Sequence, residues 1–188
     1  IGQGYIQTTP LQLCFMTAQL ANGGYKIYPT IIAKDDRNTA QEIKYDMENN
    51  LVNVKYRSLF NDKKNIEIVL DSMFGSTNEV RGTSYRSRIK DKKYQFAGTT
   101  GTSQVKRITE KVRELELKTV DIPYDDRDHA LYVAFGPYVD PRYALSILVE
   151  HGGSGSSTAA PMAKKLFKLI IDRHELREKI INKRKIQI

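Results

Sequence analysis

The residues best suited to chemistry stand together in one short run, Thr99-Thr100-Gly101-Thr102, with a further glycine, Gly98, just before it. The surrounding residues favour an extended strand. A glycine inside a strand often marks a place where a ligand or another backbone approaches closely. Threonine hydroxyls beside it can donate or accept hydrogen bonds. The run therefore indicates either a ligand-binding strand or a strand whose glycines only accommodate packing.

Other residue types capable of catalysis are scattered along the chain. His129 and His151 suggest a general base, but they are better explained as histidines at strand ends. The segment Gly152–Ser157 is predicted to be a flexible loop, and it lacks the lysine of a phosphate-binding loop. Cys14 lies among apolar neighbours and is interpreted as a small buried side chain. No His, Cys or Asp grouping has the spacing of a metal site, and no cofactor is expected.

The elements that must position the threonine-glycine run follow from periodicity and capping residues. Thr9 and Pro10 form a helix start with Gln12 placed to reach back to the cap. A second amphipathic stripe is expected to stop at Gly75. The predicted helices are residues 9–22, 65–75 and 159–175, and the predicted strands are residues 25–32, 94–104, 130–136 and 143–151.

These elements predict a fold of the α/β class, of the α+β type. The simplest layered arrangement is an antiparallel three-stranded sheet with helices against one face. Residues 33–57 and 106–118 are polar and charged, so both are interpreted as surface excursions. The whole chain, residues 1–188, is expected to belong to one domain.

Composition limits the function classes. The chain has 188 residues, 40% of them hydrophobic, and a net charge of +8, so it can bury a core and stay soluble. Basic residues become more frequent near the C-terminus, and no run of aromatic residues accompanies them for base stacking. This pattern favours a solvated helix end over a nucleic-acid contact. No run approaches the roughly 18–20 apolar residues of a membrane span. The chain begins with Ile1 rather than Met, which suggests a cut inside a longer chain.

At three blocks the sequence resembles the transpeptidase domain of class B penicillin-binding proteins, and in particular their elongation-specific branch. The blocks are residues 2–13 with 20–24, residues 96–105, and residues 129–144 with 149–153. They are similar to the helix that begins Thr-Pro-Leu-Gln-Leu, to the strand that carries Lys-Thr-Gly, and to the last two strands with the loop that follows. In order and spacing they cover nearly the whole chain.

The resemblance implies the C-terminal portion of a penicillin-binding protein or serine β-lactamase-like transpeptidase fold. Thr99 stands where the family has the lysine of its Lys-Thr-Gly motif, so the site would lack that cation. By resemblance, Gly101 lets the substrate backbone approach, and Thr100 and Thr102 offer hydroxyls to a carboxylate. The Thr102 N–H would be one oxyanion donor. The substrate-binding residues are therefore expected to be Thr99, Thr100, Gly101 and Thr102.

The resemblance also implies that catalytic parts lie elsewhere. The family's serine motif S-x-x-K and its S-x-N motif would lie upstream of Ile1, so this fragment alone is expected to be inactive. Short matches inside the chain are interpreted as coincidences: Ser87–Lys90, Ser103–Lys106 and Ser76–Asn78.

For the parent protein, the resemblance implies serine acyl transfer on the D-Ala-D-Ala end of peptidoglycan stem peptides, inhibited by β-lactams. It implies an inner-membrane anchor, a periplasmic domain, and partners among a membrane glycan polymerase and elongation-complex proteins, with no nucleic acid. The fragment itself is expected to be soluble. Two alternatives stay open: a non-catalytic truncated remnant or interaction module, and a basic nucleic-acid-binding domain.

Overall fold

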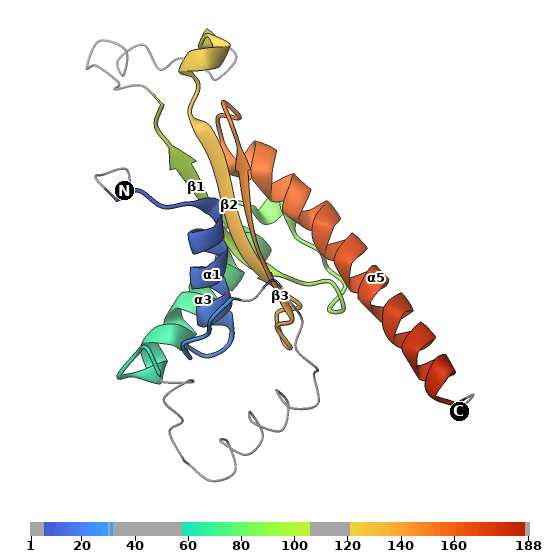
Figure 1. Cartoon of the computed structure of the whole chain (residues 1–188). Coiled ribbons are helices and arrows are strands. Elements are labelled where there is room, and N and C mark those ends of the chain that lie inside the picture. The colour runs from blue at the N-terminus through green and yellow to red at the C-terminus, as the bar shows by residue number, and fades with distance from the viewer. Residues whose placement is uncertain (1–5, 30, 32–57, 106–120, 187–188) are drawn as a thin grey trace.

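The structure, a computed structural model, describes residues 6–29, 31, 58–105 and 121–186. Its centre is a three-stranded sheet in the order β1-β2-β3. The long C-terminal helix crosses one side of this sheet and then projects away from the body (Figure 1).

The sheet is antiparallel throughout. Strand β1 spans Ala97–Ser103, β2 spans His129–Gly136 and β3 spans Tyr143–Val149. Ser103 pairs with His129 at one end of the sheet, and Gly136 pairs with Tyr143 at the other. The observed strands confirm the predicted sheet, although β1 begins three residues later than expected and β3 ends at Val149.

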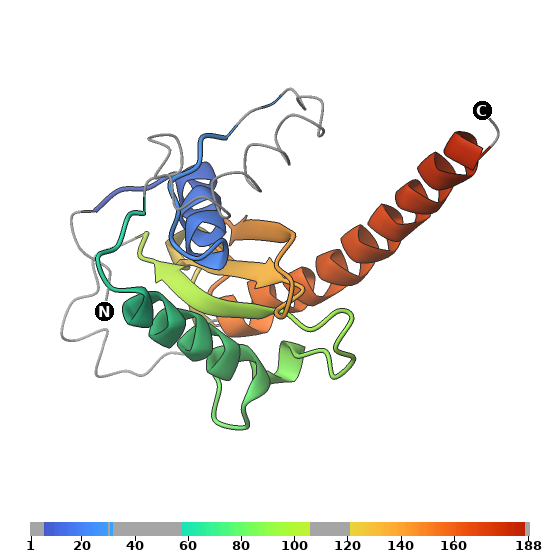
Figure 2. The same cartoon turned by 90° about the horizontal axis from the view of Figure 1, so that it is seen from below.

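Helices cover both faces of the sheet, so the prediction of helices against one face is wrong. Helix α1 spans Pro10–Ala21, α3 spans Lys63–Asn78 and α5 spans Ala160–Ile186. Figure 2 shows α1 on one side of the strands and the start of α5 on the other. The reason lies in β2, which is apolar at nearly every position. A strand of that kind has two faces to bury.

Two buried clusters correspond to these faces. The first packs α5 against β2 and contains Phe96, Ala130, Tyr132, Ala163 and Phe167, among others. The second packs α1 and α3 against the opposite face. It is built from Met73, Ala97, Val133 and Phe135, with Leu13 and Leu70 packed beside them.

Helix α1 begins and ends as its sequence predicts. The Thr9 hydroxyl accepts from the Gln12 amide at 3.2 Å, and the Thr9 amide donates to Gln12 Oε1 at 2.8 Å, which is a complete capping box. Gly23 and Gly24 then adopt φ values of 87° and 84°, in the left-handed region that ends helices.

Helix α3 continues through Gly75 to Asn78, so the predicted stop at Gly75 is wrong. A helical glycine costs only about 1 kcal/mol relative to alanine. The last turn of α3 recovers this cost because Thr77 and Asn78 hydrogen-bond to residues next to and within β1.

Three further predictions need correction, and one stays untested. The predicted strand 25–32 is reduced, in the described residues, to one bridge between Tyr25 and Ser58. The predicted loop 152–157 contains the start of a π-helical turn, Gly155–Ala159, packed on β1 and β2. Helix α5 runs eleven residues beyond the predicted end, in a segment rich in good helix formers. The predicted excursions 33–57 and 106–118 lie outside the described residues.

Within the described ranges, no helix is long and apolar enough to cross a membrane. Those same residues hold no grouping of three or more His, Cys, Asp or Glu side chains suited to a metal ion. Cys14 is half-buried rather than fully buried, and its Sγ donates to the Ala144 carbonyl at 3.4 Å. Burial raises the pKa of this thiol.

Candidate functional site

The outer edge of β1, the side turned away from β2, changes character along its length. Helix α3 covers this edge at the start of β1. The Gly98 amide donates to Thr77 Oγ1 at 3.0 Å, and Thr77 Oγ1 lies 3.1 Å from the Gly98 carbonyl oxygen. Asn78 Nδ2 donates to the Phe96 carbonyl at 2.9 Å. We call residues 96–98 the sealed segment.

A buried hydroxyl network stands behind this seal. Tyr132 Oη lies 2.8 Å from Thr77 Oγ1 and 3.1 Å from Ser84 Oγ. All three side chains are essentially inaccessible to solvent. Burial raises the pKa of the Tyr132 phenol above its ordinary value of 10.0, and the bonds from Ser84 and Thr77 oppose that shift. The phenol reaches Thr77 across Gly98, since a Cβ there would stand 2.7 Å from Tyr132 Oη.

The second part of the edge has no such cover from α3. In an antiparallel ladder, every second residue turns its amide and carbonyl away from the partner strand. Gly98 does so, and Thr100 and Thr102 share its parity along β1. No hydrogen bond joins Thr100 to a described residue on that side. We call residues 99–102 the open segment, and it contains every predicted substrate-binding residue.

Side chains of the open segment alternate between the two faces of the sheet. Thr99 pairs with Val133 and shares its face with Ala97, whereas Thr100 pairs with Tyr132 on the α5 side. Thr99 and Thr102 are exposed, and Thr100 and Gly101 are half-buried. The open segment thus offers hydroxyls on both faces and backbone groups along its edge.

The π-helical turn Gly155–Ala159, which precedes α5, packs against β1 and β2. Gly155 lies so close that a Cβ on it would stand 2.3 Å from the Leu131 carbonyl oxygen and 2.8 Å from that of Gly101. Only glycine fits such an approach without a shift of backbone. The π-helical turn and the strand backbone therefore touch directly.

Comparison with known proteins decides the family. Residues 1–168 match the family model described as the penicillin binding protein transpeptidase domain. The chain belongs to the penicillin-binding protein transpeptidase domain family. Its relatives include the peptidoglycan D,D-transpeptidase MrdA of Salmonella typhimurium, 31% identical over 92% of this chain and 26% of that protein. The MrdA protein of Acinetobacter baumannii is 33% identical over 89% of this chain and 23% of that protein.

Solved structures place this transpeptidase domain within the penicillin-binding protein 2 type. The Helicobacter pylori PBP2 in a complex with MreC has a TM-score of 0.62 and 31% identity, over 90% of this chain and 26% of that one. The Pseudomonas aeruginosa PBP2 bound to WCK 5153 has a TM-score of 0.60 and 30% identity, over 89% of this chain and 31% of that one. The chain spans about a quarter of the length of the MrdA proteins it matches.

The other residues considered as catalytic candidates are two histidines and two serines. The His151 amide donates to His129 Nδ1 at 2.9 Å, and the two rings meet edge to face. Ser87 is buried in the short 3-10 helix Tyr85–Ser87. Ser103 is exposed at the end of β1.

Sequence reasoning missed the sealing residues Thr77, Ser84 and Tyr132. The one available signal was the match Ser76–Asn78, which does serve a polar role, though a structural one. Ser76 Oγ lies 3.1 Å from Thr83 Oγ1, and the Asn78 amide is bound to Phe96. The seal itself left no local signal, because Thr77 bonds to Gly98 and to Tyr132, which lie 21 and 55 positions further along the chain.

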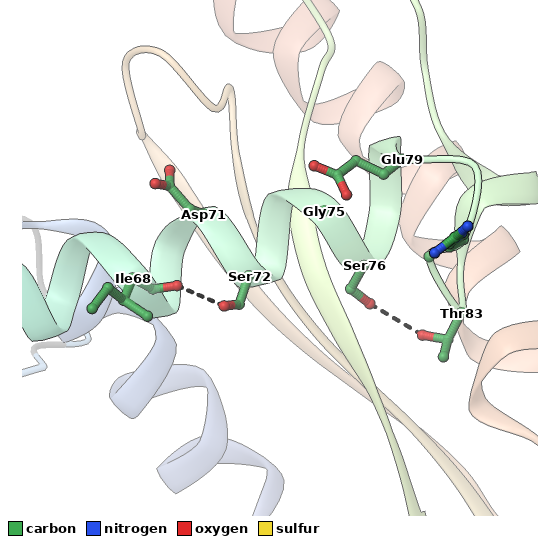
Figure 3. A pocket seen from close by; sticks show the side chains of 9 residues that line it. Ile68, Asp71, Ser72, Gly75, Ser76, Glu79 and Thr83 are labelled. Carbon is green, nitrogen blue, oxygen red and sulfur yellow. Dashed lines mark hydrogen bonds between the residues drawn. The ribbon is translucent and has the colours of Figure 1, made fainter.

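A separate hollow of about 640 Å³ lies along the outer side of α3 and the turn that follows it (Figure 3). Asp71 and Glu79 line it with small hydroxyl residues. Asp71 Oδ1 accepts from Tyr138 Oη at 2.9 Å, and the Glu79 carboxyl group folds back against Gly75. The Asp71 carboxylate is therefore engaged within the fold, and we assign the hollow no role in the family chemistry.

Proposed function

We propose that this chain is the C-terminal portion of a transpeptidase domain and that its open segment holds the D-Ala-D-Ala end of a peptidoglycan stem peptide. The observation that carries the proposal is the change along one strand edge: Thr77 and Asn78 of α3 close residues 96–98, whereas no described residue hydrogen-bonds to the outer side of Thr100. An extended peptide can add to an uncovered edge through backbone hydrogen bonds. Membership of the transpeptidase family supports this assignment.

Each residue of the open segment has a role in this proposal. The outward backbone of Thr100 and Thr102 aligns the stem peptide, and Gly101 leaves room for it. The Thr102 N–H donates to the oxyanion that forms as the scissile carbonyl is attacked. The Thr100 and Thr102 hydroxyls bind the terminal carboxylate. Thr99 occupies the place of the motif lysine, where it supplies a hydroxyl and no charge.

The reaction of the parent protein is acyl transfer from serine. The serine oxygen bonds to the carbonyl carbon, the bond to the terminal D-Ala nitrogen breaks, and that amine leaves with a proton. An amine on a neighbouring peptidoglycan strand then attacks the acyl-serine ester and displaces the serine oxygen. β-Lactams imitate the donor and remain on the serine. We propose an inner-membrane anchor and a periplasmic location for the parent, with a glycan polymerase and elongation-complex proteins as partners.

A second candidate is a non-catalytic remnant or interaction module, and the specific observation in its favour is Thr99. The family's strand carries lysine at the matching position, and a threonine there removes a cation from the pocket. The two candidates differ in one measurable quantity, which is the rate at which a labelled penicillin acylates the parent.

The first test uses this chain by itself. We expect no covalent adduct after incubation with labelled penicillin, because the proposed nucleophile is not among these residues. Intact-mass analysis is the measurement. An adduct on Ser87 or Ser103 would refute the interpretation of both motifs as coincidences.

The second test uses the parent with an intact serine motif. Replacing Thr99→Lys restores the cation, and charge-assisted hydrogen bonds are worth ~1.5–3 kcal/mol, so we expect roughly 10- to 100-fold faster acylation. The control is Val139→Lys, at an exposed position in the turn at the other end of the sheet, which adds the same charge. Equal rates for the parent and the Thr99→Lys variant would remove the open segment from the substrate site.

A further inference from the structure

A basic groove of about 790 Å³ lies between the turn after α3 and the first turns of α5. Its cations are Arg86 from the turn and Lys164, Lys165 and Lys168 from the helix. The other lining residues are small, hydroxylated or apolar: Val80, Gly82, Thr83, Tyr85, Ser87, Ser156, Ser157 and Pro161. No carboxylate lines the groove among the residues that the structure describes.

These cations differ from others near the same helix. Lys93 lies 3.4 Å from Asp172 and 2.8 Å from Glu175, two residues of α5 that do not line the groove. Arg142 lies 3.0 Å from Asp140 and 4.0 Å from Glu178. In contrast, no ion pair with a described carboxylate involves any of the groove's four cations. Asp172 interacts electrostatically with Lys168, but it does not line the groove and its ion pair is with Lys93. The basic groove is thus a concentration of positive charge with no ion-paired carboxylate among the described residues that line it.

The spacing of the lysines adds to this effect. Lys164 and Lys168 are four residues apart on α5, a spacing that puts their Cβ atoms roughly 5–6 Å apart and makes like charges repel. Lys164 is half-buried, which limits how far it can turn away from its neighbour. An anion between the two ammonium groups would convert this repulsion into attraction.

The remaining lining residues restrict the kind of anion. Thr83 and Ser157 bring exposed hydroxyl-bearing side chains, and hydroxyls can donate to phosphate oxygens. The Tyr85 ring is covered by the Arg88 guanidinium at 3.7 Å, so it is not free to stack on a nucleic-acid base. The cations also gather in one hollow instead of forming the long stripe that tracks a nucleic-acid backbone. A compact anion fits these features better than a polymer.

We propose that the basic groove binds a ligand carrying a diphosphate, or two closely spaced phosphates, either free in solution or carried on a lipid. Lysine ammonium groups bind phosphate as point charges, and Arg86 adds a planar donor that can bind two oxygens at once. The exposed Val80 and the nearby Pro161 give an attached apolar group a surface to contact. This proposal does not depend on the assignment of the open segment.

The test is calorimetric titration of the full chain with inorganic diphosphate at low salt. We expect one ligand per chain and at least about tenfold weaker binding in the double variant Lys164→Gln/Lys168→Gln, because the variant loses two charge-assisted hydrogen bonds to the ligand. The matched control is Lys179→Gln, an exposed lysine on the same helix outside the groove, which should keep its affinity. Circular dichroism monitors the fold of every variant.

A second arm identifies the source of the phosphates. Phosphatidylcholine vesicles containing an isoprenyl diphosphate are compared with phosphatidylcholine vesicles containing phosphatidylglycerol. Binding to the diphosphate vesicles alone, lost in the double variant, supports a lipid-borne ligand, whereas binding of inorganic diphosphate with the same loss supports a free one. Equal binding of both vesicles or of duplex DNA, unchanged in the double variant, overturns the proposal. No binding of any probe overturns it as well.

Discussion

The sealed and open segments are neighbours on one polypeptide edge, yet they meet different surroundings. In the sealed segment the amide and carbonyl of Gly98 are taken up by Thr77, and the Tyr132 phenol completes a buried network behind them. In the open segment Thr99 and Thr102 are exposed, and Thr100 and Gly101 are half-buried. The same strand is thus bonded to a helix at one end and carries exposed threonines at the other. Because the last turn of α3 bonds to Phe96 and Gly98, the end of this helix sets the boundary between the sealed and the open segment.

The largest expected effect separates the two glycines of β1. In Gly98→Ala the new methyl group would stand 2.6 Å from the Val133 carbonyl oxygen and 2.7 Å from Ala134 Cβ, and we expect a loss of about 3 kcal/mol in the free energy of unfolding. In Gly101→Ala the nearest atom would be Leu131 Cβ at 3.3 Å, so the loss should stay below about 1 kcal/mol. Urea unfolding measures both. Equal losses would erase the distinction between the segments.

An intermediate effect is expected from the helix side of the seal. Thr77→Val keeps the size of the side chain but leaves the Gly98 amide without its partner in a buried place. An unsatisfied buried group costs about 1–3 kcal/mol, and we expect about 2 kcal/mol in urea unfolding.

The matched control for Thr77→Val is Ser72→Ala on the same helix. The Ser72 hydroxyl is exposed and bonds only within α3, to the Ile68 carbonyl at 2.7 Å. Its loss should change the free energy of unfolding by less than about 0.5 kcal/mol. A cost for Ser72→Ala as large as that of Thr77→Val would show that the seal adds nothing.

The smallest effect concerns pH. Because burial raises the pKa of Tyr132, the folded chain keeps this proton above pH 10.0, where the unfolded chain releases it. The unfolded state then binds fewer protons, so stability falls as pH rises through that range. Tyr132→Phe should cost about 1 kcal/mol at neutral pH and make the alkaline fall less steep.

Some alkaline slope should remain in Tyr132→Phe, since burial also raises the pKa of Tyr138 and Tyr143. Chemical unfolding at several alkaline pH values is the measurement. The matched control is Tyr124→Phe, which removes the hydroxyl of an exposed tyrosine and should change the free energy of unfolding at neutral pH by less than about 0.5 kcal/mol. An unaltered slope in Tyr132→Phe would contradict the link between the phenol and the seal.

The sequence predicted those parts of the fold that depend on near neighbours. The capping box of α1 joins Thr9 to Gln12, and the strands β2 and β3 follow from two apolar runs joined by a short turn. The glycines and a family resemblance also singled out the open segment, whose role in substrate binding stays a prediction. What could not be predicted depends on distant partners. Helix α3 passes Gly75 because its last turn binds β1 some twenty residues on, and no local pattern encodes that contact.

The coverage of both faces of the sheet also depends on contacts between residues that are far apart in the sequence. A continuous apolar strand such as β2 has two faces to bury, but the sequence of β2 does not say which helices cover them. The predicted strand 25–32 failed for a related reason. Its alternation was adequate, yet among the described residues only Ser58 pairs with it, at Tyr25.

The contact of Gly155 with the backbone of β1 and β2 has a mechanical consequence. Two backbones that meet without a side chain between them leave no compressible layer, so a displacement of one is transmitted to the other almost undiminished. Gly155 begins the helical segment that continues into α5, whose far end extends well beyond the sheet (Figure 1). A force applied to that projecting end would therefore reach the carbonyl of Gly101, and the helix would act as a lever on the strand.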